Sequence, residues 1–348
     1  MTKPLTSIAD LTAAGLFSPE QADRLAEVAA RYAVAITPDL VALIDSDDRD
    51  DPIARQFVPS LAELTLQTEE RIDPIGDDAH SPLAGIVHRH KDRVLLKAVA
   101  ACPVYCRFCF RREAVGPGRA NALTVRQLEA AIAYIASHRE IWEVILTGGD
   151  PFILSPRRAG EIAQGLADIP HVKIVRWHTR VPLTDPKRVS EAFVRAIRAD
   201  GAATFVAVHA NHPREFTPAG REAIARLVDS GIPVVSQSVL LKGVNDDVDT
   251  LETLMRTLVE LRIKPYYLHH PDLAPGTSHF RVSIEQGLSF VRELRRRISG
   301  LAMPTYVIDI PGGHAKVPLE STNVEKLTDR RYRIRDHDGQ WHVYPPSL

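Results

Sequence analysis

The chain has 348 residues, of which 45% are hydrophobic and 25% are charged, and its formal net charge at pH 7 is -1. This composition is that of an ordinary globular protein, and it excludes the strong basic charge that is typical of nucleic-acid or membrane-surface binding. No apolar run approaches the roughly 20 residues that cross a bilayer, and the first residues lack the apolar core of a secretion signal. We therefore expect a cytoplasmic protein with no nucleic-acid or membrane partner.

The first 85 residues predict a helical extension without a strong strand. Ser18 precedes Pro19, and Gln21 follows three residues after Ser18, which is the pattern of a helix N-terminus with a capping box. Leu25 and Val28 then recur at helical spacing. We assign residues 1–85 to an N-terminal helical extension.

Strand-like runs alternate with helical segments across residues 86–320. One helical segment, residues 123–138, carries a second capping-box pattern in Thr124 and Gln127. Alternation of this kind predicts an α/β fold with a parallel sheet and right-handed crossovers. Seven strand-like runs fit a closed or partial (β/α) barrel, and a doubly wound open sheet is the alternative. The runs are RVLLKAV (93–99), WEVILTG (142–148), VKIVRW (172–177), ATFVAVH (203–209), PVVSQSVLL (233–241), KPYYLHH (264–270) and PTYVIDI (304–310).

The last segment, residues 321–348, is a short tail that follows the predicted barrel. Its sequence YRIRDHDGQWHVY places Asp338 and Gly339 between two strand-like runs. An Asp-Gly pair in this position favours a tight hairpin turn. We therefore expect a C-terminal hairpin.

Residues that carry chemistry follow the strand-like runs directly. Active sites of (β/α) barrels lie on the loops at the C-terminal ends of the strands. The three cysteines follow the first run, TGGDP (147–151) ends and follows the second, and IDIPGGHAKVP (308–318) follows the seventh. We expect these segments to meet in a single site.

All three cysteines of the chain, Cys102, Cys106 and Cys109, lie within eight positions in a C-x3-C-x2-C pattern. An odd number cannot form a complete disulfide framework. A structural zinc needs a fourth ligand, for which His88 and His90 are the nearest residues in sequence. Iron–sulfur clusters also favour cysteine thiolates, and three thiolates on a four-iron cluster leave one iron open. Three buried core thiols are a further alternative, although the neighbouring arginines are unusual for a core.

Two other segments suggest ligand contacts. Gly148 and Gly149 would let the backbone approach a ligand closely, and Asp150 offers a carboxylate to a hydroxyl or an ammonium group, although a simple turn explains the same residues. Lys316 follows a Gly312–Gly313 pair. A lysine in such a loop can bind an aldehyde cofactor covalently, whereas most lysines lie on the surface.

Residues from about 80 to 320 resemble the lysine 2,3-aminomutase family of radical S-adenosylmethionine enzymes. The resemblance lies in CPVYCRFCFRR (102–112), TGGDP, HANHPREFTPAGREAIARLVDSGIPVVSQSVLLKGVND (209–246), PYYLHHPDLAPGTSHFRV (265–282) and PTYVIDIPGGHAKVP (304–318). It implies a (β/α) barrel of the radical S-adenosylmethionine type and three cofactors, namely a [4Fe-4S] cluster, S-adenosylmethionine and pyridoxal 5'-phosphate. The implied activity is the conversion of L-lysine to β-lysine, with a flavodoxin or ferredoxin as electron donor.

The resemblance also implies roles for individual residues. The three cysteines would hold the cluster, and Lys316 would hold pyridoxal phosphate. Arg111 would bind the substrate α-carboxylate, and Asp272 with Asp309 would bind the ε-ammonium of lysine. Contacts to S-adenosylmethionine would come from Gly148, Gly149, Asp150, His209 and Gln237, and contacts to the phosphate of the second cofactor from Arg89 and Arg93.

The two aspartates also support lysine as the substrate on physical grounds. They lie at the ends of two adjacent strand-like runs, so their carboxylates can converge. Two neighbouring anions are unfavourable unless a cation shares them, and an ε-ammonium is such a cation.

Several points stay open. The chain lacks the additional cysteines that hold an intersubunit zinc in longer family members, so we expect no zinc, and a homo-oligomer is one possibility. His90 replaces a tyrosine that is common in the family. The alternatives are production of β-lysine for modification of elongation factor P, an aminomutase acting on another amino acid, and a module without catalytic activity.

Overall fold

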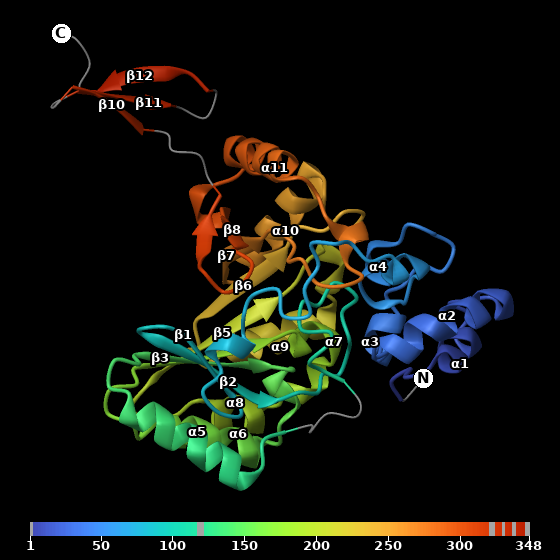
Figure 1. Ribbon diagram of the computed structural model, residues 1–348, viewed down its shortest axis with the longest axis horizontal. Coiled ribbons are helices and arrows are strands. Elements are labelled where there is room, and N and C mark those ends of the chain that lie inside the picture. Colours follow the sequence, from blue (N-terminus) through green and yellow to red (C-terminus); the bar gives the residue numbers. More distant parts are fainter. Residues whose placement is uncertain (1–2, 117–121, 320–323, 329–330, 336–338, 345–348) are drawn as a thin grey trace.

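A sheet of nine strands forms the centre of the molecule (Figure 1). The computed structural model describes residues 3–116, 122–319, 324–328, 331–335 and 339–344. Neighbouring strands follow one another in chain order from β1 to β9. The strands are β1 (Ile86–His90), β2 (Arg93–Val99), β3 (Glu143–Gly148), β4 (Ile174–Thr179), β5 (Ala203–His209), β6 (Val234–Val239), β7 (Ile263–His269), β8 (Thr305–Asp309) and β9 (Lys316–Pro318).

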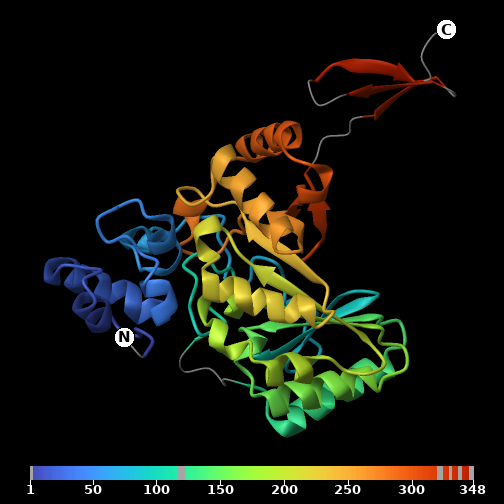
Figure 2. The ribbon, with the colours of Figure 1, turned by 180° about the vertical axis from the view of Figure 1, so that it is seen from behind.

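The sheet confirms the predicted partial (β/α) barrel. Strands β2 to β8 are all parallel to their neighbours, and β1 and β9 add antiparallel edges. A consecutive strand order differs from the reversed order of a doubly wound sheet, so that alternative was wrong. The connecting helices cover the outside of the curved sheet (Figures 1 and 2). They are α5 (Val125–Ser137), α6 (Pro156–Ala167), α7 (Val181–Thr184), α8 (Glu191–Ile197), α9 (Pro218–Asp229), α10 (Val248–Glu260) and α11 (Ile284–Arg297).

Two strands differ from the sequence prediction. His88 and His90 were expected to precede the first strand, but they lie on β1, which pairs antiparallel with β2. The segment that contains Lys316 was expected to be a loop, but it forms β9 and pairs with β8. Short edge strands of three to five residues carry too little periodicity for a prediction from sequence.

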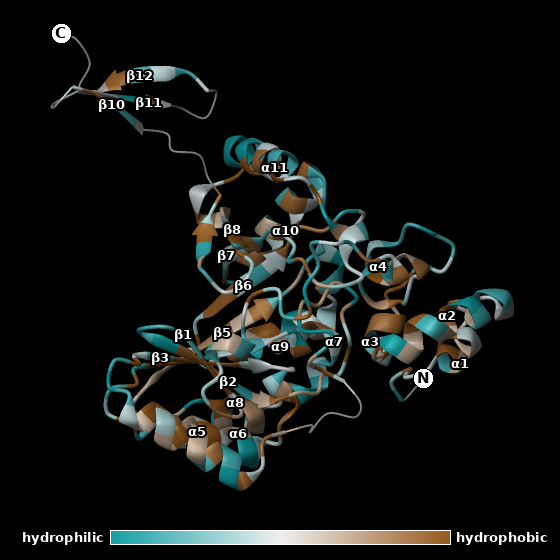
Figure 3. Ribbon diagram, viewed as in Figure 1, coloured by the Kyte–Doolittle hydropathy of each residue, from teal (hydrophilic) through white to brown (hydrophobic). Residues whose placement is uncertain are grey.

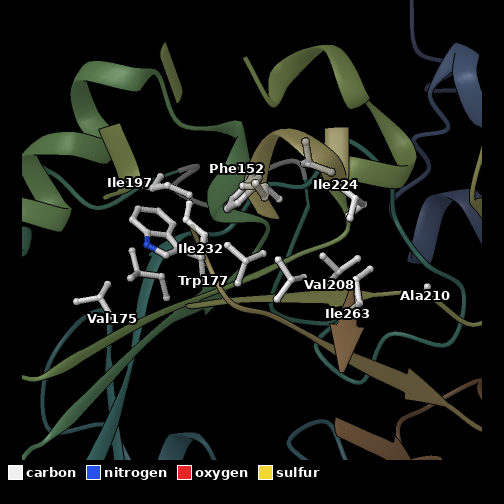
Figure 4. Close-up of a cluster of buried hydrophobic side chains, with 14 of the residues drawn as sticks. Phe152, Val175, Trp177, Ile197, Val208, Ala210, Ile224, Ile232 and Ile263 are labelled. Atoms are coloured by element: carbon white, nitrogen blue, oxygen red, sulfur yellow. The ribbon is translucent and has the colours of Figure 1, made fainter. Parts of the chain in front are cut away.

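The main core lies between the sheet and its outer helices. Figure 4 shows Phe152, Trp177 and Ile197 in this layer, and all three are buried. Brown and teal segments alternate along α5 and α11 in Figure 3, as expected for helices with one face packed against the sheet. This packing fixes the strands, and therefore their C-terminal ends, relative to one another.

The N-terminal extension contains four helices: α1 (Ile8–Ala13), α2 (Pro19–Arg31), α3 (Pro38–Val41) and α4 (Pro52–Phe57). The capping box of Ser18 and Gln21 is present at α2, and that of Thr124 and Gln127 is present at α5. The extension packs against the segment that contains the cysteines, where the amide of Arg107 donates to the carbonyl of Gln56 over 2.8 Å.

The tail contains three antiparallel strands rather than a two-stranded hairpin. Strands β11 (Arg331–Arg335) and β12 (Trp341–Tyr344) pair as expected, and β10 (Val324–Thr328) adds a third strand to β11. Of the predicted turn, Gly339 has a positive φ of 83°, and Asp338 lies outside the described residues. This small sheet lies apart from the barrel in Figures 1 and 2. Within the described part of the chain, no helix is long and apolar enough to cross a membrane.

Candidate active site

One cavity of about 410 Å³ is lined by residues of the barrel strands and of the loops at their C-terminal ends. Every site residue that the sequence analysis named lines this cavity, although the residues come from eight strands or the loops that follow them. They are Arg89, Arg93, Cys102, Cys106, Cys109, Arg111, Gly148, Gly149, Asp150, His209, Gln237, Asp272, Asp309 and Lys316.

The three cysteines lie on the loop after β2, and none forms a disulfide. Burial raises the pKa of the Cys102 and Cys109 thiols, and it raises that of Cys106 to about 12. Without a metal, these thiols are therefore neutral at pH 7, and binding of a metal centre would displace their protons. Among the described residues, no three His, Cys, Asp or Glu side chains converge on a single metal ion. A multi-iron cluster does not require such convergence, because each thiolate binds a different iron.

A buried carboxylate ties the cysteine loop to the N-terminal extension. Glu63, which is fully buried, accepts a hydrogen bond from Nε of Arg107 over 3.0 Å and a further one from Arg112. The guanidinium of Arg112 also lies over the ring of Tyr32, 3.5 Å from the ring centroid. These charges compensate one another, so the loop is held by paired groups rather than by isolated buried charges.

The Gly148–Asp150 turn packs closely against the beginning of the cysteine loop. A Cβ atom at Gly149 would lie 2.2 Å from the carbonyl oxygen of Ala101, and Gly148 has a φ of 104°. The carboxylate of Asp150 accepts hydrogen bonds from Oγ1 of Thr179 over 2.8 Å and from the amide of Arg180 over 2.7 Å. The close approach that requires glycine is therefore an approach to the cysteine loop, and Asp150 joins β3 to β4.

Lys316 and Asp309 face each other across the β8–β9 pair. They are direct partners in the antiparallel register, which brings their side chains to the same face. Nζ of Lys316 donates to Oδ2 of Asp309 and lies 3.3 Å from Nδ1 of His269. The other oxygen of Asp309, Oδ1, is buried and accepts no hydrogen bond.

The pKa values of Lys316, Asp309 and the nearby Asp272 are shifted in different directions. Burial lowers the pKa of Lys316, although the charge of Asp309 opposes the shift. Burial acts to raise the pKa of Asp309, but the contacts with His269 and Lys316 hold it well below its usual value. Burial and the nearby charge of Asp309 raise the pKa of Asp272 to about 7. The site therefore combines one firmly ionised carboxylate with one that titrates near neutral pH.

Arginines also line the cavity, and one of them lies beside Asp309. Nε and Nη2 of Arg111 each lie 3.0 Å from Oδ2 of Asp77. Nη1 of Arg89 donates to the carbonyl of Ile75 over 2.7 Å, and its Nη2 lies 3.5 Å from Asp309. Arg93 pairs with the exposed Asp92 over 2.9 Å. These cations can receive the anionic groups of a ligand.

Sequence reasoning missed several residues of the site. Asp77 holds Arg111 and Glu63 anchors the cysteine loop, and neither is marked by a motif because both lie in the N-terminal extension. His178 and His269 also line the cavity. Both stand at or next to the C-terminal end of a parallel strand, where the barrel rule expects site residues, but the sequence offered no basis for assigning them a role.

A partial (β/α) barrel with a C-x3-C-x2-C loop after its first parallel strand defines the radical S-adenosylmethionine class of enzymes. Residues 97–255 match the family model described as "Radical SAM superfamily". The L-lysine 2,3-aminomutase of Fusobacterium nucleatum is 35% identical over 96% of this chain and 78% of the relative. That of Acetoanaerobium sticklandii is 35% identical over 92% of this chain and 77% of the relative. The glutamate 2,3-aminomutase of Clostridioides difficile is 33% identical over 92% of this chain and 75% of the relative. The chain belongs to the lysine 2,3-aminomutase family, whose members are isomerases.

The residues of the cavity fit the cofactors of this family. Three free thiols line one wall, which suits a [4Fe-4S] cluster with one open iron. Lys316 is largely enclosed and its pKa is lowered, as a lysine that attaches pyridoxal phosphate requires. The buried Nε2 of His209 has no hydrogen-bond partner, which leaves it available to S-adenosylmethionine.

Proposed function

We propose that this protein converts L-lysine to β-lysine by moving the amino group from C2 to C3. The observation that carries the proposal is the acidic end of the cavity. The buried Oδ1 of Asp309 accepts no hydrogen bond, although Nη2 of Arg89 lies 3.5 Å from it. The carboxyl group of Asp272 lies close enough for its pKa to respond to Asp309. An ammonium group supplies the missing donor and the charge that two neighbouring carboxylates need.

The two ends of the cavity select a substrate by charge. Arg111 uses Nε and Nη2 for Asp77, and the remaining Nη1 side of its guanidinium is available to the α-carboxylate. The ε-ammonium then lies toward Asp272 and Asp309. A glutamate side chain would place a third carboxylate beside these two, which is unfavourable without an added cation. Lysine therefore matches the site better than glutamate, the substrate in the name of one relative.

Residues of the chain position the cofactors and the substrate. We assign the three cysteines to the cluster, Lys316 to pyridoxal phosphate, and Arg89 with Arg93 to its phosphate. The backbone of Gly148–Asp150, together with His209 and Gln237, forms the wall for S-adenosylmethionine. When bound, the cofactors supply the radical that abstracts hydrogen and the carbonyl group that carries the migrating nitrogen.

Lys316 must lose a proton before it can attack a carbonyl carbon. Its lowered pKa favours that loss, and Asp309 and His269 hold its Nζ in place.

The proposal includes a one-electron donor, because the described chain offers a single cysteine set for a cluster. A flavodoxin or ferredoxin of the cytoplasm suits this role. We also propose that the protein forms a homo-oligomer. Measurement of its molecular mass in solution tests this part of the proposal.

Substrate competition under anaerobic conditions tests the proposal. The reconstituted protein should form β-lysine from lysine, and glutamate, alanine and arginine in excess should reduce the rate little. Asp309→Asn should lower lysine turnover by two orders of magnitude or more, since loss of one partner of a buried charge pair costs about 3–5 kcal/mol. Equal turnover of glutamate by the wild type, or full lysine turnover in both Asp272→Asn and Asp309→Asn, would contradict the assignment.

A further inference from the structure

The proposed cofactor contacts fall on separate groups of strands. Residues assigned to S-adenosylmethionine lie at the ends of β3, β5 and β6, whereas those assigned to pyridoxal phosphate and lysine lie on or after β1, β2, β7, β8 and β9. Strand β4 pairs with β3 on one side and with β5 on the other. The end of β4 therefore lies in the middle of the wall for S-adenosylmethionine, although no residue of β4 has been assigned to ligand binding.

Three residues of β4 line the cavity, namely Arg176, His178 and Thr179. Arg176 pairs with Glu143 and Thr179 donates to Asp150, which leaves His178 without an assigned contact. Side chains alternate between the two faces of a strand, and Trp177 packs into the outer hydrophobic layer in Figure 4. His178 points to the opposite face and lines the cavity. Its ring lies 5.4 Å from the ring of His209, centroid to centroid, in an edge-to-face arrangement.

One ring nitrogen of His178 lacks a partner in the protein. Its Nε2 is buried without a hydrogen bond, and the same holds for Nε2 of His209. Two other histidines also have a buried nitrogen without a partner, namely His269, which contacts Lys316, and His279, which lies outside the cavity. By contrast, His88 bonds to Tyr134 over 2.9 Å, and His171 bonds to the carbonyl of Ile135 over 3.1 Å. A buried polar atom without a partner costs free energy, so two such atoms side by side in a cavity indicate a ligand.

The charge state of this pair suits a neutral, polar part of a ligand. Burial lowers the pKa of His178 well below its usual value, and it lowers that of His209 to about 3. Both rings are therefore neutral at pH 7, and each has one donor and one acceptor nitrogen. Ribose hydroxyls and the edge of an adenine ring offer matching groups.

We propose that His178 is a further binding residue for S-adenosylmethionine, and that it contacts the nucleoside part of this cofactor together with His209. This inference rests on the proposed function, since it takes S-adenosylmethionine as the ligand of the β3–β6 wall. It separates the residues that bind this cofactor from those that bind lysine.

Two affinities measured on the cluster-loaded protein without reductant test the inference. Equilibrium dialysis gives the affinity for S-adenosylmethionine, and the absorbance of bound pyridoxal phosphate gives the affinity for lysine in its absence. His178→Ala should weaken the binding of S-adenosylmethionine about tenfold, the usual worth of one hydrogen bond with its desolvation cost. Lysine affinity should change less than about twofold, because His178 makes no contact there in this proposal. His178→Gln, which keeps a donor and an acceptor, should recover part of the loss.

A matched control is His171→Ala, which removes an imidazole near the other end of β4 and outside the cavity. It should leave both affinities unchanged. Before the comparison, the iron content of each variant shows that it carries the cluster. Borohydride labelling of Lys316 shows that it carries pyridoxal phosphate. Unchanged affinity for S-adenosylmethionine in His178→Ala, or an equal loss of affinity for both ligands, would overturn the inference. A wild type that binds no S-adenosylmethionine would overturn the proposed function itself.

Discussion

Lysine should bind more tightly as the pH rises from 6 to 8, because Asp272 must be ionised to hold an ammonium group. Burial and the charge of Asp309 raise the pKa of Asp272 to about 7. Below that pH the carboxyl group carries a proton in the ligand-free site, and binding of lysine must displace it. Asp309 does not contribute to this pH dependence, because its pKa lies far below the range.

The size of the effect follows from the ionised fraction of Asp272. With a pKa of about 7, the fraction ionised is roughly 0.1 at pH 6 and roughly 0.9 at pH 8. Lysine affinity should therefore rise about tenfold across this interval through this group alone. Other groups, including the α-amino group of the ligand, also titrate, so the comparison needs a ligand that shares them.

Norleucine provides that comparison, since it has the chain of lysine without the ε-ammonium. The absorbance of bound pyridoxal phosphate reports the affinity for both amino acids without S-adenosylmethionine. The ratio of lysine affinity to norleucine affinity should rise about tenfold from pH 6 to pH 8 in the wild type. The ratio should stay constant in Asp272→Asn. In the control Asp78→Asn, which removes a charge at an exposed residue outside the cavity, the ratio should rise as in the wild type. A constant ratio in the wild type would refute the reasoning.

Four further predictions address the cofactors and the stability of the site. Cys106→Ala should lose nearly all iron after anaerobic reconstitution yet keep the label on the cofactor lysine, and full iron content would contradict the cluster assignment. Borohydride reduction followed by peptide mapping should label Lys316, and a label on Lys97 instead would remove it from the site. Asp272→Asn should raise the free energy of unfolding of the ligand-free protein by up to about 4 kcal/mol at pH 8. Because the folded pKa is raised, the gain should shrink as the pH falls toward 5 in denaturant titrations, and a gain that does not depend on pH would contradict the raised pKa. Glu63→Gln should lower the free energy of unfolding by about 3–5 kcal/mol, since it leaves two buried arginines without their carboxylate; an unchanged denaturation midpoint would show that this network does not hold the loop.

Much of the fold follows from local signals in the sequence. Capping residues such as Ser18 and Thr124 act within one turn of their helix, so their effect can be read without tertiary information. The parallel strands are recognisable because each is rich in apolar, β-branched or aromatic residues and lies between turn residues. The site then follows from the rule that chemistry gathers at the strand ends of a barrel.

Other features depend on contacts between distant segments. The register that pairs Asp309 with Lys316 comes from an edge strand too short to be recognised. The contact between Asp77 and Arg111 joins the extension to the cysteine loop, and no spacing in the sequence encodes it. The need for glycine at residue 149 was attributed to a ligand, whereas the structure shows the backbone of Ala101 in that space.

The central claim is that this chain moves the α-amino group of lysine to the neighbouring carbon. Lysine labelled with ¹⁵N at the α-amino group should be incubated without oxygen with the loaded protein, S-adenosylmethionine and reductant. NMR should find β-lysine with the ¹⁵N bonded to C3, and no product should form with Cys106→Ala. Unchanged lysine in the presence of a complete cluster, or β-lysine that has lost the ¹⁵N, would contradict the account.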